Sequence, residues 1–118
     1  MKTLAQHLLI ELFDCNYNAI NDVKKVEKVM VEAANIAKAT IVKVMFHKFE
    51  PLGVSGVVVI AESHFSIHTW PEYKYAAVDL FGCGEKILFD KAIEYIIKNF
   101  KPKKVTQLEV KRGIILND

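Results

Sequence analysis

The stretch that decides the fold reads Gly53-Val54-Ser55-Gly56-Val57-Val58-Val59-Ile60-Ala61-Glu62-Ser63-His64-Phe65-Ser66-Ile67-His68. A strand-like apolar run, residues 57–61, changes abruptly into a carboxylate, two hydroxyls and two imidazoles. A thiol, Cys83, follows a little later between two glycines. Structural strands seldom gather so many reactive groups in so short a span, so we expect the functional site here.

The two halves of this stretch form a predicted hairpin. If residues 54–61 and 63–68 pair around a turn centred between Ala61 and Glu62, residues whose numbers sum to 123 face each other. Ser55 then lies opposite His68, within side-chain contact distance, and the Glu62–Ser63 peptide bond lies at the bend. Ala61-Glu62 is not a favoured two-residue turn sequence, which leaves a wider loop as an alternative.

The rest of the chain supplies a sheet and two helices. Alternating and β-branched residues predict strands at 4–13, 40–49, 54–61, 64–69, 75–81 and 105–110. Apolar residues three and four apart predict an amphipathic helix over 20–37, capped by Asn18 or Asn21, and a second over 89–100 that ends before Pro102.

This order predicts the α+β class: a single two-layer domain, residues 1–118, with an antiparallel β-sheet and two helices on one face. The strand at 54–61 is apolar on both faces, which places it inside the sheet. The apolar side chains on the face without helices must then be buried against a partner. We expect a homodimer in which the two sheets pack face to face.

Composition narrows the functional classes. Hydrophobic residues make up 52% and charged residues 25%, as in a globular protein, and the net charge of +2 gives no reason to expect nucleic acid as a partner. We expect no membrane span and no signal peptide, hence a cytoplasmic protein. Cys15 and Cys83 are expected as free thiols. His64 and His68 share a strand face, but no third or fourth ligand accompanies them, so we expect no metal.

Two longer motifs carry a family resemblance. They are Ala61-Glu62-Ser63-His64-Phe65-Ser66-Ile67-His68-Thr69-Trp70-Pro71-Glu72 and Tyr75-Ala76-Ala77-Val78-Asp79-Leu80-Phe81-Gly82-Cys83-Gly84. Together they closely resemble the short, pyruvoyl-dependent prokaryotic S-adenosylmethionine decarboxylase proenzymes. The resemblance covers nearly the whole chain, including His7 and Glu11 in the first strand.

The resemblance implies a self-processing enzyme. Ser63 would attack the carbonyl carbon of Glu62, an N-to-O acyl shift would give an ester, and β-elimination would break the chain. The products would be a beta chain, residues 1–62, and an alpha chain, residues 63–118, which begins with a pyruvoyl group made from Ser63. Ser55 would support this processing, and His68 would transfer the proton, as an imidazole does well near neutral pH.

The resemblance also implies the chemistry on the substrate. The pyruvoyl carbonyl would form a Schiff base with S-adenosylmethionine and accept the electrons released as carbon dioxide leaves. Cys83 would return a proton to the substrate carbon. Phe49 would stack on the adenine, and Glu72 would accept hydrogen bonds from the ribose. The implied assembly is a homodimer of cleaved alpha and beta chains, with its pocket near the subunit interface, and the product feeds spermidine and other polyamine synthesis.

Other interpretations remain open at this point. Taken one at a time, Ser63 is an ordinary turn serine, Cys83 a buried small hydrophobe, and His64 and His68 surface histidines. His7, His47 and Cys15 are assigned structural roles. Some archaeal relatives use the same scaffold as a pyruvoyl-dependent arginine decarboxylase, and specificity is not a property of the fold. A non-enzymatic α+β binding module is the remaining alternative.

Overall fold

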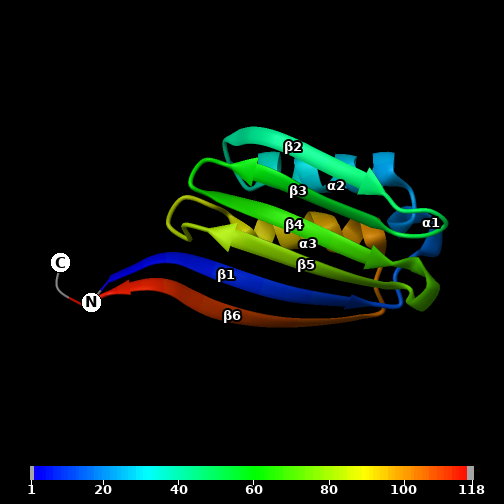
Figure 1. The fold of residues 1–118 in the computed structure, drawn as a ribbon. Helices are drawn as coiled ribbons and strands as arrows, with labels where there is room; N and C mark the ends of the chain where they lie inside the picture. The colour runs from blue at the N-terminus through cyan, green and yellow to red at the C-terminus, as the bar shows by residue number, and fades with distance from the viewer. Residues whose placement is uncertain (1, 117–118) are drawn as a thin grey trace.

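The computed structural model describes residues 2–116, and Figure 1 shows their arrangement. In chain order the elements are β1 (Lys2–Phe13), α1 (Tyr17–Ile20), α2 (Val23–Ile36), β2 (Ile41–Lys48), β3 (Val54–Ile60), β4 (Ser63–Trp70), the 3₁₀ helix η1 (Pro71–Tyr73), β5 (Tyr75–Gly82), α3 (Phe89–Phe100) and β6 (Lys104–Ile115). In this described part, no helix is long and apolar enough to cross a membrane.

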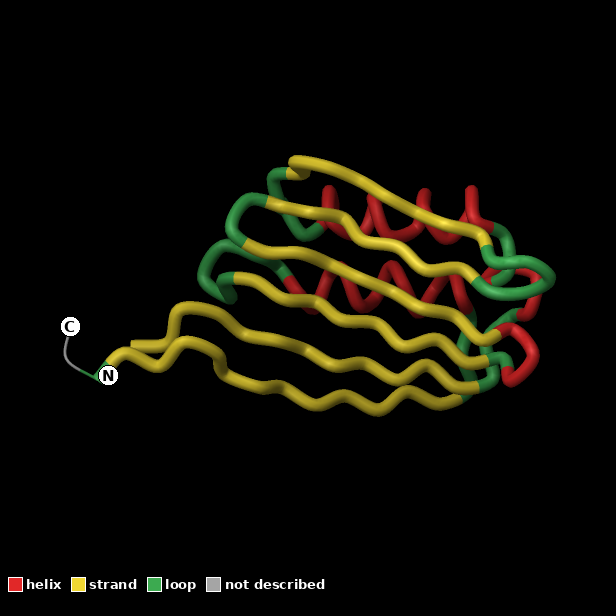
Figure 2. Tube along the Cα trace, viewed as in Figure 1, coloured by secondary structure: helices red, strands yellow, loops and turns green. Residues whose placement is uncertain are grey.

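The strands form one antiparallel sheet in the order β2-β3-β4-β5-β1-β6. Both long helices, α2 and α3, lie behind the same face of this sheet (Figures 1 and 2). The predicted α+β class, the six strands and the two long helices on one face are therefore confirmed. β3 is interior, as predicted, and β4 and β5 occupy the centre of the sheet.

Alternation along the strands separates two faces of the sheet. In β4, Phe65, Ile67 and Thr69 are buried on the helix side, where they belong to a core that also contains Met30 of α2 and Phe100 of α3. The intervening residues of β4 point to the opposite side. We call this helix-free side of the sheet the open face. It carries exposed apolar side chains that a soluble monomer would be expected to cover: Met45, Val59, Leu108 and Val110.

Several predicted boundaries needed correction. The helix predicted over 20–37 begins later, at Val23, where Asp22 caps α2 by accepting hydrogen bonds from the N–H groups of Lys24 and Lys25 at 3.0 and 3.2 Å, and Ile20 belongs to the short helix α1 before it. Asn16 caps α1, so the assignment of Asn18 or Asn21 as caps was wrong. Asn21 instead accepts a hydrogen bond from the N–H of Gly53.

The last strand is also longer than its sequence pattern indicated. β6 continues to Ile115, whereas the prediction ended at residue 110 and treated the rest as a tail. The additional residues pair with the start of β1, from Ala5↔Arg112 to Lys2↔Ile115, and the two strand ends extend beyond the helices as a narrow ribbon (Figure 1). Pairing with β1 rather than burial maintains this segment as a strand, which is why hydrophobic periodicity did not reveal it.

Candidate active site

The predicted hairpin is present in the predicted register. Ser55 pairs with His68, Val58 with Phe65, and Ile60 with Ser63, so paired residue numbers sum to 123 throughout β3 and β4. The loop is closed by two residues, Ala61 and Glu62, and the alternative of a wider loop is not realised. Ser63 is the first residue of β4, immediately after the bend.

Ser63 packs closely against the end of β5. A Cβ atom placed on Gly82 would lie 3.0 Å from Ser63 Oγ, so a glycine at this position brings the β5 backbone against the serine. Cys83 follows Gly82 directly and is partly exposed as a free thiol. The structure therefore brings Ser63 and Cys83 to the same end of the sheet, next to the Glu62–Ser63 bond.

Ser55 and His68 occupy the other end of the same hairpin. They face each other as cross-strand neighbours on the open face, and His68 lies five residues along β4 from Ser63, a separation of about 16 Å at the usual strand rise. The alternation of β4 also directs the Ser63 side chain toward the opposite side of the sheet from His68. Within one chain, the four predicted reactive residues form two separate groups.

The Ser55–His68 group lines a cavity on the open face with a volume of about 460 Å³. Phe49 forms part of its wall, and the Phe49 ring centroid lies 5.7 Å from that of His68. His47 also lines this cavity and contacts Phe49 edge to face at 4.6 Å. Glu72 lies in η1, exposed, and is not among the lining residues. The structure thus joins Phe49 to this group and leaves Glu72 outside it.

His68 is held by aromatic packing. Its ring lies 4.2 Å from that of Trp70, which stacks on Tyr75 at 5.2 Å. The Tyr75 hydroxyl donates a hydrogen bond to Glu11 Oε1 at 2.6 Å. Burial, followed by this contact with Glu11, raises the pKa of Tyr75 to about 12, so the phenol stays protonated and remains a donor over the physiological range.

A polar network crosses the centre of the open face and was not predicted. Arg112 Nη1 lies 3.4 Å from His7 Nδ1, and His7 Nε2 lies 3.1 Å from Asp79 Oδ1. Because Arg112 is always a donor, His7 Nδ1 accepts, and the ring proton on Nε2 is donated to Asp79. Ser66 donates to the other oxygen of Asp79 at 3.2 Å. His7 therefore has defined polar partners, although its sequence pattern indicated only a structural role.

Sequence reasoning also missed His47. Cross-strand pairing aligns His47, Ser55 and His68 on three successive strands of the open face, so the serine hydroxyl lies between two histidine positions. The alternation of residues in β2 predicts which side of its strand His47 occupies. The pairing of β2 with β3 was needed to place it beside Ser55.

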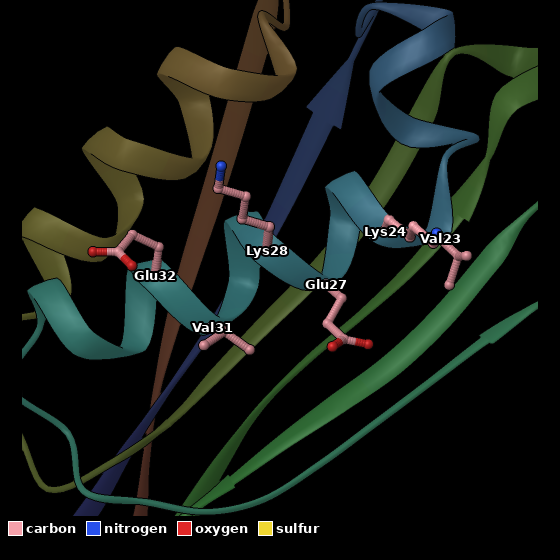
Figure 3. Close-up of a pocket in the computed structure, with 6 residues that line it drawn as sticks. All are labelled: Val23, Lys24, Glu27, Lys28, Val31 and Glu32. Carbon is pink, nitrogen blue, oxygen red and sulfur yellow. The ribbon is translucent and has the colours of Figure 1, made fainter.

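A second hollow of about 260 Å³ runs along α2 (Figure 3). All the residues that line it come from this one helix, and the charged ones among them point outward. The lining residues are Val23, Lys24, Glu27, Lys28, Val31 and Glu32. None of these residues belongs to the motifs, and opposite charges along an exposed helix face are typical of a solvated surface. The open-face cavity is therefore the better candidate for a site.

The two thiols are expected to differ strongly in reactivity. Cys15 is buried, its Sγ lies 3.6 Å from the Leu12 carbonyl oxygen, and burial followed by the nearby Asp14 raises its pKa to about 11. Because the thiolate is the reactive form, iodoacetamide should modify Cys83 and leave Cys15 unmodified in the folded protein. Peptide mass mapping after brief treatment checks this. In denaturant both residues should react, and equal labelling of the two in the folded protein would contradict the assignment.

Known proteins resemble this chain over nearly its whole length. The family model described as S-adenosylmethionine decarboxylase matches residues 6–113. The chain is 55% identical to an S-adenosylmethionine decarboxylase proenzyme of Thermodesulfovibrio yellowstonii, over 98% of this chain and 85% of the relative. It is 52% identical to the proenzyme of Moorella thermoacetica, over 98% and 92%, and 47% identical to that of Methanococcus maripaludis, over 98% and 94%.

The fold comparison points the same way. The crystal structure of the adenosylmethionine decarboxylase from Aquifex aeolicus superposes with a TM-score of 0.92 at 35% identity, covering 100% of this chain and 98% of that one. The arginine decarboxylase and the binding-module alternatives are not favoured by these relatives. The match over nearly the whole chain, in sequence and in fold, shows that this chain belongs to the S-adenosylmethionine decarboxylase family.

Proposed function

We propose that this chain cleaves itself between Glu62 and Ser63 and then decarboxylates S-adenosylmethionine with a pyruvoyl group derived from Ser63. The observation that carries the proposal is the position of Ser63, directly after a two-residue bend and against Gly82, the residue before Cys83, in a chain of this family. The products of cleavage are a beta chain, residues 1–62, and an alpha chain, residues 63–118.

The cleavage uses atoms that already adjoin one another in the bend. Ser63 Oγ bonds to the Glu62 carbonyl carbon while the C–N bond breaks and the hydroxyl proton passes to the Ser63 nitrogen. Removal of the Ser63 Cα proton then expels the Glu62 carboxylate. Water replaces the nitrogen, ammonia leaves, and the pyruvoyl group remains. Ser55 and His68 are the groups that we assign to the proton transfers.

A homodimer completes the site in this proposal. Ser63 and Cys83 lie at one end of the sheet, and Ser55 and His68 lie at the other, on the open face. We propose that two sheets pack face to face around a two-fold axis with the Ser63 end of one chain beside the Ser55–His68 end of its partner. The exposed apolar residues of the open face are the surface that such packing buries.

The remaining residues act in the decarboxylation itself. The pyruvoyl carbonyl supplies the electron sink for loss of carbon dioxide. Cys83 holds the proton that is returned to the substrate carbon. Phe49 offers an exposed ring for the adenine and, like other aromatic faces, is a favourable neighbour for the sulfonium cation. We assign Glu72 to hydrogen bonds with the ribose hydroxyls. We place this reaction in the cytoplasm, where its product serves as the aminopropyl donor for polyamine synthesis.

The experiment has two readouts on the purified chain. Denaturing intact-mass measurement should show two chains split between Glu62 and Ser63, with the second lacking a free amino terminus and reacting with a carbonyl reagent. Release of labelled carbon dioxide should then be seen from carboxyl-labelled S-adenosylmethionine and not from arginine. An uncleaved chain after prolonged incubation and hydroxylamine treatment would contradict self-processing. Cleavage with turnover of arginine alone would contradict the substrate.

A further inference from the structure

The bend before Ser63 has an unusual backbone. Glu62 has a φ of 69°, in the left-handed region that residues with a side chain rarely adopt. The other described non-glycine residues with positive φ are Asp14, Lys38, Lys74 and Lys101, and each lies just after a strand or helix. A left-handed residue is a common way to end such an element. Among the described residues, Glu62 alone combines this conformation with the middle of a tight hairpin loop.

The pattern of φ angles is also wrong for such a short loop. Two-residue hairpins favour type I′ or II′ turns, in which the first central residue has a positive φ, because these turns match the twist of the strands. Here Ala61 is not among the positive-φ residues and Glu62 is, which is the type II pattern. Glycine or asparagine normally occupies the second position of that turn, and this chain has glutamate there.

Contacts on both sides hold the bend in this form. The Ala61 N–H donates a hydrogen bond to the Thr40 carbonyl oxygen at 2.8 Å, which ties the loop to the residue before β2. On the other side, Ser63 packs against Gly82 of β5 and pairs with Ile60. An unfavourable backbone conformation persists only where its surroundings determine it in this way, and such positions concentrate at functional sites.

We propose that the left-handed Glu62 bend strains the Glu62–Ser63 bond in the intact chain and thereby sets the rate of its self-cleavage. The inference rests on the proposed function, because it concerns the same bond. Strain present before the acyl shift and released once the C–N bond opens lowers the barrier of that step. The bend, rather than the Glu62 carboxylate, is the part that matters.

Changing the turn to a relaxed one tests this directly. The pair Ala61→Asn with Glu62→Gly creates Asn-Gly, the preferred type I′ sequence. Self-cleavage, followed by intact mass over time, should slow about tenfold, the size expected when the cost of one left-handed residue is removed from the starting state. In a Ser63→Ala background, which cannot cleave, the same pair should raise the melting temperature by about 4 °C.

Two controls separate strain from other effects. Glu62→Gln removes the charge and keeps a side chain on the left-handed residue, so it should slow cleavage less than Glu62→Gly does. Lys101→Gly relieves the same kind of backbone cost at the end of α3, where φ is 52°, so it should raise the melting temperature without changing cleavage. Glu62→Gly alone, a smaller change that retains Ala61, should slow cleavage in the same direction as the pair.

The outcomes distinguish this inference from the proposed function. If the wild-type chain cleaves and the Asn-Gly variant becomes more stable yet cleaves equally fast, the strain is not used and the inference fails while the function stands. If Glu62→Gln slows cleavage as much as Glu62→Gly, the carboxylate is responsible and the inference also fails. If the wild-type chain never cleaves, the proposed function fails with it.

Discussion

A heterodimer of two inactive variants, one Ser63→Ala and the other His68→Ala, is expected to turn over S-adenosylmethionine at about half the wild-type rate. Each variant alone should be inactive, because the first lacks the nucleophile and the second lacks the proton-transfer group. In the mixed dimer one site carries both substitutions and the other carries neither. The complete site combines Ser63 of the His68→Ala chain with His68 of the Ser63→Ala chain.

The expectation follows from the separation of the two groups within one chain. Ser63 and His68 begin and nearly end the same strand, and the alternation of β4 directs their side chains to opposite sides of the sheet. No rotation of either side chain spans the length of strand between them. In the proposed dimer, a partner chain that packs on the open face brings its own Ser55 and His68 to the Ser63 end, where Ser63 lies at the end of β4 beside the bend and not in the interior of the sheet.

The measurement needs co-expression of the two chains with different tags and purification through both. Intact mass should show cleavage of the His68→Ala chain only, since that chain retains Ser63. A matched control pairs Ser63→Ala with Cys83→Ala: Ser63 and Cys83 lie at the same end of one sheet, so no site is complete and turnover should not return. Activity in that control, or no activity in the main pair, would contradict a site in which Ser63 and Cys83 come from one chain and His68 from its partner.

Replacing Cys83 with alanine is expected to leave self-cleavage intact and to reduce turnover at least a hundredfold, in line with the loss of a positioned general acid. The physical reason is the position of Cys83 directly after Gly82, the last residue of β5, whose backbone packs against Ser63. Without it, a proton delivered to the carbon derived from Ser63 instead leaves an amine there and ends the activity of that site. Turnover should therefore also decay with time.

Initial rates and the mass of the alpha chain before and after turnover check both parts. The alpha chain of the Cys83→Ala variant should lose its reactivity toward a carbonyl reagent as substrate is consumed. Cys15→Ala is the control, because Cys15 is buried in the core and absent from the open-face cavity. It should affect stability and leave the rate per folded molecule unchanged. A Cys83→Ala enzyme with a steady, near-normal rate would exclude the proton-donor role.

Local sequence patterns were sufficient to predict much of this fold. The hairpin register was predictable because a turn centred between Ala61 and Glu62 fixes which residues of β3 and β4 face each other, Ser55 and His68 among them. The two long helices were predictable from apolar residues three and four apart. The start of α2 after Asp22 was not predicted, because the apolar spacing continues through this position. The hydrogen bonds that the Asp22 side chain accepts from the first N–H groups of the helix set the boundary instead.

The sequence by itself determined the hairpin, the motif that identifies the family and the residue types available for chemistry. Only the tertiary structure decided which of those residues meet. His7 reaches Asp79 across 72 positions of chain because β1 inserts beside β5, and Arg112 reaches His7 because β6 pairs with β1. Strand order is a long-range property, set by how whole strands pack over α2 and α3, and no local period encodes it. For the same reason the position of Cys83 at the Ser63 end of the hairpin became visible only in the folded sheet, where β5 pairs with β4.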